Sequence, residues 1–390
     1  MRIAIVVAFY DPRLDYFETT AARALAVDHE VHVVTTVRRS QTLPDDGDGS
    51  LELFPPGTTT VEGVTLRRLV PWLSLGQRVV AAGVPTALSA IQPDVVIQVV
   101  PAQLFSIPAS RFARSHGIPL VYISGENSQQ GPQKGLGLLL KRLYLTTVWR
   151  FIARRTAGTA ARVIVTTEET GRMLRAAGIQ RASLMPLPYR SDKFFLSQAL
   201  RDSTRRSLGI EARFVTIFVG RFVPDKRIEL IVEEWERTAA EAPDAHLLLV
   251  GSTGDEYSQL VCAAVAASPN ADRITVLPFA DSSHINGYLN AADTGVWPTV
   301  SVGIQQAMAT GLLVLIPAGS PGEFLIQGPA QALGGTYRDG ASDNQEGALA
   351  GAITAARSAS GEGPRKTRAD LAATLYSDVT LGDRVLGGLS

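Results

Sequence analysis

The chain has 390 residues, enough for two or three domains of ordinary size. Its 37 Lys and Arg residues balance 37 Asp and Glu residues, which argues against a dedicated nucleic-acid binder, because such proteins are usually basic overall. The two halves differ, however. Residues 1–190 hold 21 basic and 14 acidic side chains, whereas residues 191–390 hold 16 and 23.

The single cysteine, Cys262, excludes an intrachain disulfide, which fits a reducing compartment. The apolar run at residues 3–10 is too short to span a membrane, and no small-residue cleavage site follows it. We therefore expect a buried first strand and a cytoplasmic protein.

Short runs rich in Val and Ile alternate with helical periodicity along the first half of the chain. Runs without polar alternation are typical of parallel strands buried on both faces, and their alternation with helices predicts a doubly wound α/β sheet. We expect a helix at 17–26, a polar loop at 38–62, and strands at 3–9, 29–35, 94–100, 120–123 and 162–165.

The same pattern restarts after the prolines at 186 and 188, which disfavour regular structure. The sequence predicts strands at 214–219, 246–250, 273–277, 294–297 and 313–316, and helices at 228–242, 257–267, 285–292 and 304–310. We expect domains at 1–190 and 191–345. Residues 346–390 are predicted to form a polar linker and a helix near 368–376 that packs back on the first domain; the polar stretch covers 340–366.

A basic loop follows the first strand of the second domain. Gly220 would let the backbone approach a ligand closely. Arg221 and Lys226 place a planar guanidinium group and a compact ammonium group in the same loop. Open α/β sheets bind ligands at the carboxyl ends of their strands, and two such cations suit the oxygens of a diphosphate. A solvated basic loop is the alternative.

A second candidate segment lies at the start of the helix predicted at 304–310. Ser301, Val302, Gly303 and Ile304 form a small-residue turn that leaves backbone amides free to meet an anion. The helix stops at Gly311, as helices often do at glycine.

Together these segments resemble the retaining glycosyltransferases of the GT-B fold, in particular the large GT4-like family (glycosyl transferases group 1). Residues 219–226 resemble its GR-x4-K element, 246–251 its LLIVG strand, 290–298 its ADV-x-V-x-PS stretch and 306–311 its EAMACG helix. The resemblance implies an α/β fold of two Rossmann-like domains facing a cleft. It also implies a donor site at Gly220, Arg221, Lys226, Ser301, Val302, Gly303, Ile304 and Gln306, with Arg221 and Lys226 catalytic.

The chain departs from this family at three points, one of which is the position after the fourth strand, often His in the family and here part of Ser124-Gly125-Glu126-Asn127. The family's carboxylate pair, spaced E-x7-E, falls on Pro298 and Gln306, neither of which is acidic. A glutamine carbonyl can still accept a hydrogen bond from a ribose, with less charge assistance. The family's N-terminal glycine-rich loop is also missing, since residues 9–15 contain no glycine.

The expected activity is transfer of a sugar from a nucleotide-diphosphate sugar to a glycan or lipid-linked acceptor, with retention implied by the family alone. The two cations already serve the electrostatic role at the leaving diphosphate, so we expect no metal and no cofactor. Asp15, Glu18 and Glu126 are candidates for contact with the acceptor; helix capping or surface charge is their alternative.

A basic segment at 127–167 accounts for the positive excess of the first half. It contains no acidic residue and interleaves cations with apolar side chains, as helices at membrane surfaces do. A core-facing helix with a solvated basic face is the alternative. In the membrane interpretation, Lys141, Arg142, Trp149 and Arg150 face an anionic bilayer, with the protein peripheral on its inner face.

Two other functions stay open at this stage. The replaced carboxylates favour a non-catalytic GT-B protein that binds a nucleotide sugar or scaffolds a partner transferase, whereas the intact Arg221 and Lys226 oppose it. A nucleotide-sugar epimerase of the same fold is a weaker third possibility.

Overall fold

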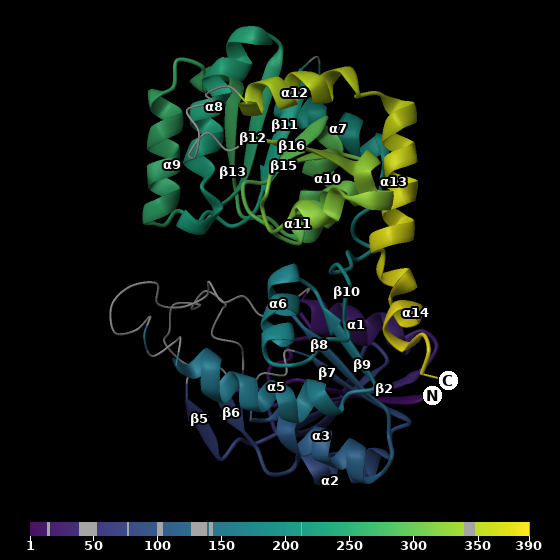
Figure 1. Ribbon diagram of the computed structural model, residues 1–390. Helices are drawn as coiled ribbons and strands as arrows, with labels where there is room; N and C mark the ends of the chain where they lie inside the picture. Colours follow the sequence, from purple (N-terminus) through teal and green to yellow (C-terminus); the bar gives the residue numbers. More distant parts are fainter. Residues whose placement is uncertain are drawn as a thin grey trace. The chain divides into compact units, whose positions relative to one another are not determined.

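The computed structural model describes residues 1–13, 16–38, 53–75, 78–99, 104–125, 139, 143–211, 213–338 and 348–389. It divides the chain into two compact units, each with its own sheet (Figure 1). Unit 1 comprises Met1–Leu187 and Asp378–Ser390, and unit 2 comprises Pro188–Ser377.

Unit 1 is built on an eight-stranded sheet in the order β10-β9-β8-β7-β1-β2-β4-β3. All neighbouring strands are parallel except β3 and β4, and β5 and β6 form a separate antiparallel ribbon. The strands are β1 (Arg2–Val6), β2 (Glu30–Thr36), β3 (Gly57–Val61), β4 (Val64–Leu69), β5 (Leu73–Leu75), β6 (Arg78–Val80), β7 (Val95–Val99), β8 (Leu120–Ser124), β9 (Arg162–Val165) and β10 (Ala182–Leu184). The helices are α1 (Phe17–Ala26), α2 (Val84–Ile91), α3 (Ser106–Ser115), the π-helix η1 (Leu145–Trp149), α5 (Arg150–Thr156), η2 (Ala157–Thr159), α6 (Glu168–Ala176), η7 (Asp378–Thr380) and α14 (Leu381–Leu386).

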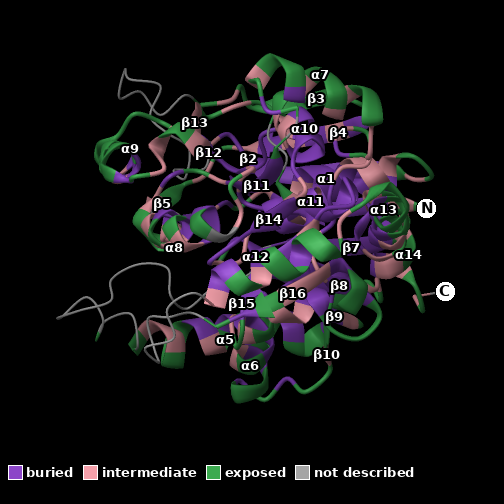
Figure 2. Cartoon of the chain, turned by 90° about the horizontal axis from the view of Figure 1, so that it is seen from above, coloured by how far each residue is buried: buried purple, intermediate pink, exposed green. Residues whose placement is uncertain are grey.

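Both faces of this sheet are covered, which explains the lack of polar alternation in its strands. Successive side chains of a strand point to opposite faces, so Ala4 and Val6 pack with α2 and α3 while Ile3 and Ile5 pack with α1 and α14. The buried strands lie between helices whose outer surfaces are exposed (Figure 2).

Unit 2 has a six-stranded parallel sheet in the order β13-β12-β11-β14-β15-β16. Its strands are β11 (Phe214–Val219), β12 (Ala245–Ser252), β13 (Ile274–Pro278), β14 (Thr294–Val296), β15 (Leu313–Pro317) and β16 (Gly334–Tyr337). Its helices are α7 (Gln198–Leu208), η3 (Pro224–Lys226), α8 (Ile228–Glu241), α9 (Glu256–Ala267), η4 (Ala271–Arg273), α10 (Ser282–Ala291), α11 (Gly303–Ala309), η5 (Glu323–Ile326), η6 (Gly328–Leu333), α12 (Ala348–Ser358) and α13 (Glu362–Tyr376). Its core includes the fully buried Trp235 and Trp297.

Three sequence expectations are wrong. Gly57–Val61 is not loop but the edge strand β3, which carries no apolar pattern because its side chains are mostly exposed. The linker expected at 346–390 is largely helical, since α12 buries Leu349 and Ile353 in unit 2. The helix predicted near 368–376 is confirmed as part of α13, but it belongs to unit 2; the C-terminal helix that packs back on unit 1 is α14 (Figure 1).

Candidate functional site

The loops that follow β11 and β12 touch through their backbones at the carboxyl edge of the unit 2 sheet. Gly251 has φ +127°, and a Cβ there would lie 2.1 Å from the carbonyl oxygen of Gly220. The amide of Phe222 donates to the carbonyl oxygen of Gly251 at 3.2 Å. A glycine is therefore required at 251, and this contact fixes where the chain leaves β11 just before Arg221.

Arg221 and Lys226 lie in this loop, as the sequence predicts. Arg221 is exposed, whereas Lys226 is half-buried and its Nζ donates to the carbonyl oxygen of Val300 at 3.2 Å. Burial lowers the pKa of Lys226, and the nearby charge of Arg221 lowers it further. An anion beside both cations would relieve this repulsion and favour the charged form of the half-buried ammonium group.

Trp297 joins the end of β14 to the end of β11. Its indole Nε1 donates to the carbonyl oxygen of Val219 at 3.1 Å, and the ring is fully buried. Gly295 makes room for the ring, because a Cβ there would lie 2.3 Å from it. Gly303 also lies close to the carbonyl oxygen of Val219, because a Cβ added at Gly303 would lie 3.2 Å from that oxygen. This packing holds the loop at 298–302 beside Gly220.

The loop after β14 contains the remaining donor candidates. Gly303 and Ile304 are buried at the first turn of α11, and Ser301 and Val302 are half-buried. The carbonyl oxygens of Ser301 and Val302 accept from the amides of Ile304 and Gln306, each at 3.2 Å. Gln306 is half-buried and lies near the start of α11, the helix that begins after the loop following β14.

Three hydroxyl groups at this edge are buried without a hydrogen-bond partner among the residues that the structure describes. They belong to Thr299, Ser301 and Ser320. Sequence reasoning missed Thr299 and Ser320; the available signal was only that each follows a parallel strand. Buried hydroxyls cost free energy when unpaired, so they are groups that a polar ligand can satisfy.

Two family models match the chain. The glycosyl transferase 4-like domain covers residues 16–190, and glycosyl transferases group 1 covers residues 213–354. The chain belongs to the GT4-like, group 1 glycosyltransferase family. No curated protein has a sequence that matches it.

Solved structures of glycosyltransferases share the GT-B fold of this family member. HepE of Anabaena in complex with UDP has a TM-score of 0.71 at 16% identity, covering 100% of this chain and 99% of that one. Sucrose-phosphate synthase of Thermosynechococcus elongatus has a TM-score of 0.66 at 17% identity, with 100% and 99% covered. WaaG, a glycosyltransferase involved in lipopolysaccharide biosynthesis, has a TM-score of 0.60 at 16% identity, with 99% and 100% covered.

Unit 1 of this glycosyltransferase holds the acceptor candidates. Glu18 lies in the first turn of α1, where burial raises the pKa of its carboxyl to about 7. Asp15 and Glu126 lie outside the described residues. The sequence reasoning missed Asp11, which is buried after β1 and accepts from Arg13 Nε at 3.0 Å and Nη2 at 2.9 Å. The available signal was the absence of glycine from residues 9–15, which does not indicate that Asp11 and Arg13 pair.

The basic segment of unit 1 differs from its prediction. Trp149 is 3% exposed and packs in the core with α3, so the prediction that it faces a membrane is wrong. Arg150 donates through Nη2 to the carbonyl oxygen of Ala176 and so binds the end of α6. Lys141 and Arg142 lie outside the described residues. The side chains that do reach the surface include Leu143, Val148, Phe151, Arg154 and Arg155.

Within the described ranges, no three His, Cys, Asp or Glu side chains come together as metal ligands would. Across the same ranges, no helix is both long enough and apolar enough to cross a membrane.

Proposed function

We propose that this glycosyltransferase moves a sugar from a nucleotide-diphosphate sugar to a glycan or lipid-linked acceptor, with retention and without a metal. The observation that carries the proposal is the loop after β11, where Arg221 and the half-buried Lys226 stand together. HepE was crystallised with UDP and with UDP-glucose, which supports a nucleotide-sugar donor. The activity attributed to WaaG supports a role in cell-surface polysaccharide or glycolipid synthesis.

In the proposed reaction, the bond between the anomeric carbon and the diphosphate oxygen breaks. The acceptor hydroxyl oxygen bonds to that carbon, and its proton passes to the leaving phosphate oxygen. Arg221 and Lys226 stabilise the negative charge that develops on the diphosphate. Gln306 accepts a hydrogen bond from the ribose, and the unpaired hydroxyls of Thr299 and Ser301 supply further polar contacts to the donor.

The first test measures UDP binding to single variants of the two cations. Arg221→Ala and Lys226→Gln should each weaken UDP binding by about 1.5–3 kcal/mol, the usual value of a hydrogen bond to a charged group. The glutamine retains a donor for the carbonyl oxygen of Val300. Arg206→Ala, which removes an exposed cation of α7, serves as the control and should bind UDP normally. Unchanged UDP, GDP and ADP affinities in both site variants would refute the donor site.

A non-catalytic nucleotide-sugar binder is the second candidate. It is favoured by one observation: the family's carboxylate pair is replaced by Pro298 and Gln306. Both candidates predict nucleotide binding, so only turnover separates them. Release of free nucleotide from a panel of donor sugars supports the enzyme, whereas tight binding without release from any donor supports the second candidate.

We infer that unit 1 also contacts an anionic membrane, with the protein on its cytoplasmic face. Leu143, Val148 and Phe151 are exposed on η1 and its flanking turns, and Arg154 and Arg155 are exposed beside them. The guanidinium of Arg155 lies over the ring of Phe151, 4.9 Å from its centroid. Apolar side chains bordered by cations suit the headgroup region of an anionic bilayer, which would bring a lipid-linked acceptor to unit 1.

A further inference from the structure

Unit 2 has a cavity of about 790 Å³ at the amino edge of its sheet. Asp293 lines it and immediately precedes β14, and its Oδ2 accepts from the amide of Val215 at the start of β11 at 2.7 Å. The loops around Arg221 and Lys226 leave the opposite, carboxyl ends of the same strands. The cavity is therefore separate from the proposed donor site.

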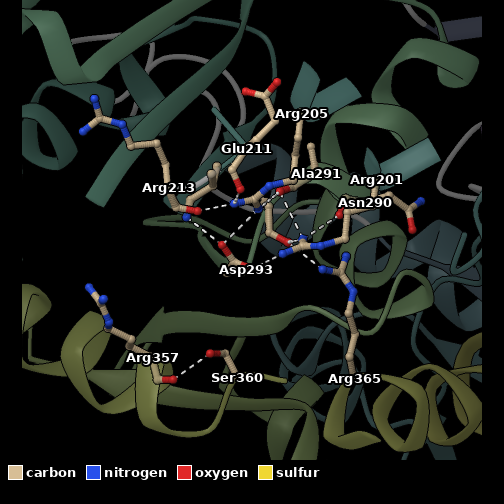
Figure 3. A network of polar contacts seen from close by, with 12 residues as sticks. Arg201, Arg205, Glu211, Arg213, Asn290, Ala291, Asp293, Arg357, Ser360 and Arg365 are labelled. Atoms are coloured by element: carbon tan, nitrogen blue, oxygen red, sulfur yellow. Dashed lines mark hydrogen bonds and ion pairs between the residues drawn. The ribbon is translucent and has the colours of Figure 1, made fainter. Parts of the chain in front are cut away.

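Arginines from α7 and α13 converge beside this cavity (Figure 3). Arg201 donates to Asp293 Oδ1 at 2.5 Å and to the carbonyl oxygen of Ala292 at 2.7 Å. Arg365 donates to the carbonyl oxygens of Ala292 at 2.6 Å and Thr310 at 2.9 Å. These carbonyls belong to the carboxyl ends of α10 and α11, where unpaired oxygens and the helix dipole favour cations.

Arg201 and Arg205 share one carboxylate, that of Asp293. Arg205 also contacts Asp293, at 3.3 Å, so that side chain is already bound by two guanidinium groups and a backbone amide. Burial, together with repulsion from Arg201, Arg368 and Arg205, lowers the pKa of Arg365 to about 9. Glu362, the other acid of the lining, is exposed. The cavity wall therefore carries an excess of positive charge.

Arg368 is only 6% exposed and yet incompletely bonded. Its Nε donates to the carbonyl oxygen of Gly311 at 2.8 Å and its Nη1 to that of Ala359 at 3.4 Å. Neither of these hydrogen bonds uses Nη2, and Arg368 contributes none of the described buried atoms that lack a partner, so this nitrogen is accessible to solvent or a ligand. Arg368 lines the cavity together with Lys366 and Gln198, whose side chains are exposed. No side chain caps α13, which begins at the same wall.

We propose that this cavity binds a small phosphate-bearing molecule at a site separate from the donor site. Guanidinium groups present planar pairs of N–H donors that match phosphate oxygens, and a dianion would offset the repulsion among the arginines. The volume lies within the range of small-molecule sites and exceeds what a single phosphate needs. The ligand class is therefore a phosphorylated metabolite such as a sugar phosphate, with inorganic phosphate as its minimal form.

Calorimetric titration of the full chain tests this proposal with glucose 6-phosphate, inorganic phosphate and unphosphorylated glucose. Gln198→Glu and Lys366→Glu place negative charge at the cavity without removing a buried arginine, and the Lys366–Asp370 pair that the latter breaks is exposed. Each should weaken binding of the phosphorylated probe about tenfold. Gln327→Glu, an exposed position away from the cavity, is the matched control and should bind normally.

Arg221→Ala separates the two sites, because it should reduce UDP affinity and leave binding of the phosphorylated probe unchanged. Two results would overturn the proposal directly: no binding of either phosphate probe at millimolar concentration, or equal affinity for glucose and glucose 6-phosphate. A third would be that Arg221→Ala abolishes binding of the phosphorylated probe while Gln198→Glu binds it with unchanged affinity. None of these results bears on whether UDP binds at Arg221.

Discussion

At the scale of single residues, burial acts in opposite directions on the ionisable groups of the two candidate sites. It raises the pKa of Glu18 to about 7 and lowers the pKa of Lys226, because in both cases the ionised form loses hydration. The half-buried ammonium group of Lys226 lies near the positive charge of Arg221, and this arrangement favours an anion even before a ligand binds. Glu18 instead titrates near neutral pH, so its carboxyl group is only partly ionised there.

The pKa of Glu18 predicts a stability that depends on pH. The ordinary value is 4.5 and the folded value about 7, so the folded state retains a proton that the unfolded state releases between these values. The stabilisation is fully present below pH 4.5 and is lost as the pH rises through 7. Glu18→Gln should remove this loss and exceed the wild type at pH 8 by on the order of 2 kcal/mol.

Urea denaturation at pH 5 and pH 8 measures this effect. Glu256→Gln, in the first turn of the unit 2 helix α9, is a suitable control and should leave the pH dependence unchanged. Equal pH dependence in Glu18→Gln and the wild type would show that Glu18 is ionised in the folded protein.

At the scale of elements, the apolar pattern located most of the described strands and missed α7, which a polar group holds in place. The predicted strands at 214–219 and 162–165 match β11 and β9. Helix α7 has no apolar stripe; its buried side chain is Arg205, which bonds to the carboxyl end of α10. A pattern search cannot find a helix that is anchored by a guanidinium group.

The same limit applies to the candidate site. Arg221 and Lys226 could be predicted because they lie in one loop, whereas Thr299 and Ser320 come from separate loops that only the folded sheet brings to one edge. Trp149 was misplaced because its assignment rested on cations interleaved with apolar side chains along the sequence. That pattern does not indicate which of these side chains is buried in the core, as Trp149 is.

The exposed side of η1 and α5 gives a prediction for membrane binding. The full chain should sediment with vesicles of anionic lipid at low salt and be released at high salt. Leu143→Asp combined with Phe151→Asp should weaken binding to the vesicles about tenfold. Each substitution removes an apolar side chain that would be buried among the lipid headgroups, and each introduced aspartate is repelled by the anionic lipid. Phe279→Asp, at a phenylalanine of unit 2 that is more exposed than Phe151, should bind like the wild type. Failure of the wild type to sediment at low salt would remove the membrane from the proposal.

At the scale of the whole molecule, unit 1 is assembled from two distant parts of the sequence. The chain leaves unit 1 at Leu187 and returns to it at Asp378. Helix α14 then packs on α1, where Leu381 and Val385 are fully buried with Leu25. Arg384 adds a hydrogen bond from Nη2 to the carbonyl oxygen of Pro186, at 2.9 Å. The last helix is thus part of the unit 1 core.

Shortening the side chain of Leu381 should therefore destabilise unit 1 selectively. Leu381→Ala removes a fully buried side chain and should cost about 2–5 kcal/mol of unfolding free energy. Hydrogen exchange would show the loss of protection in the strands of unit 1, with the strands of unit 2 unaffected. Leu260→Ala, at an exposed position of α9, should change neither unit. A loss of protection confined to unit 2 would contradict this assignment.

The return of the chain to unit 1 also determines the order in which the protein can be completed on the ribosome. The ten strands of unit 1 are synthesised first, yet the helix that covers Leu25 is made after all of unit 2. Unit 2 has its entire sequence available while unit 1 still lacks α14. The nascent chain must therefore leave the apolar surface that α14 covers, including Leu25 of α1, exposed while unit 2 is synthesised, and this surface is where we expect a chaperone to bind.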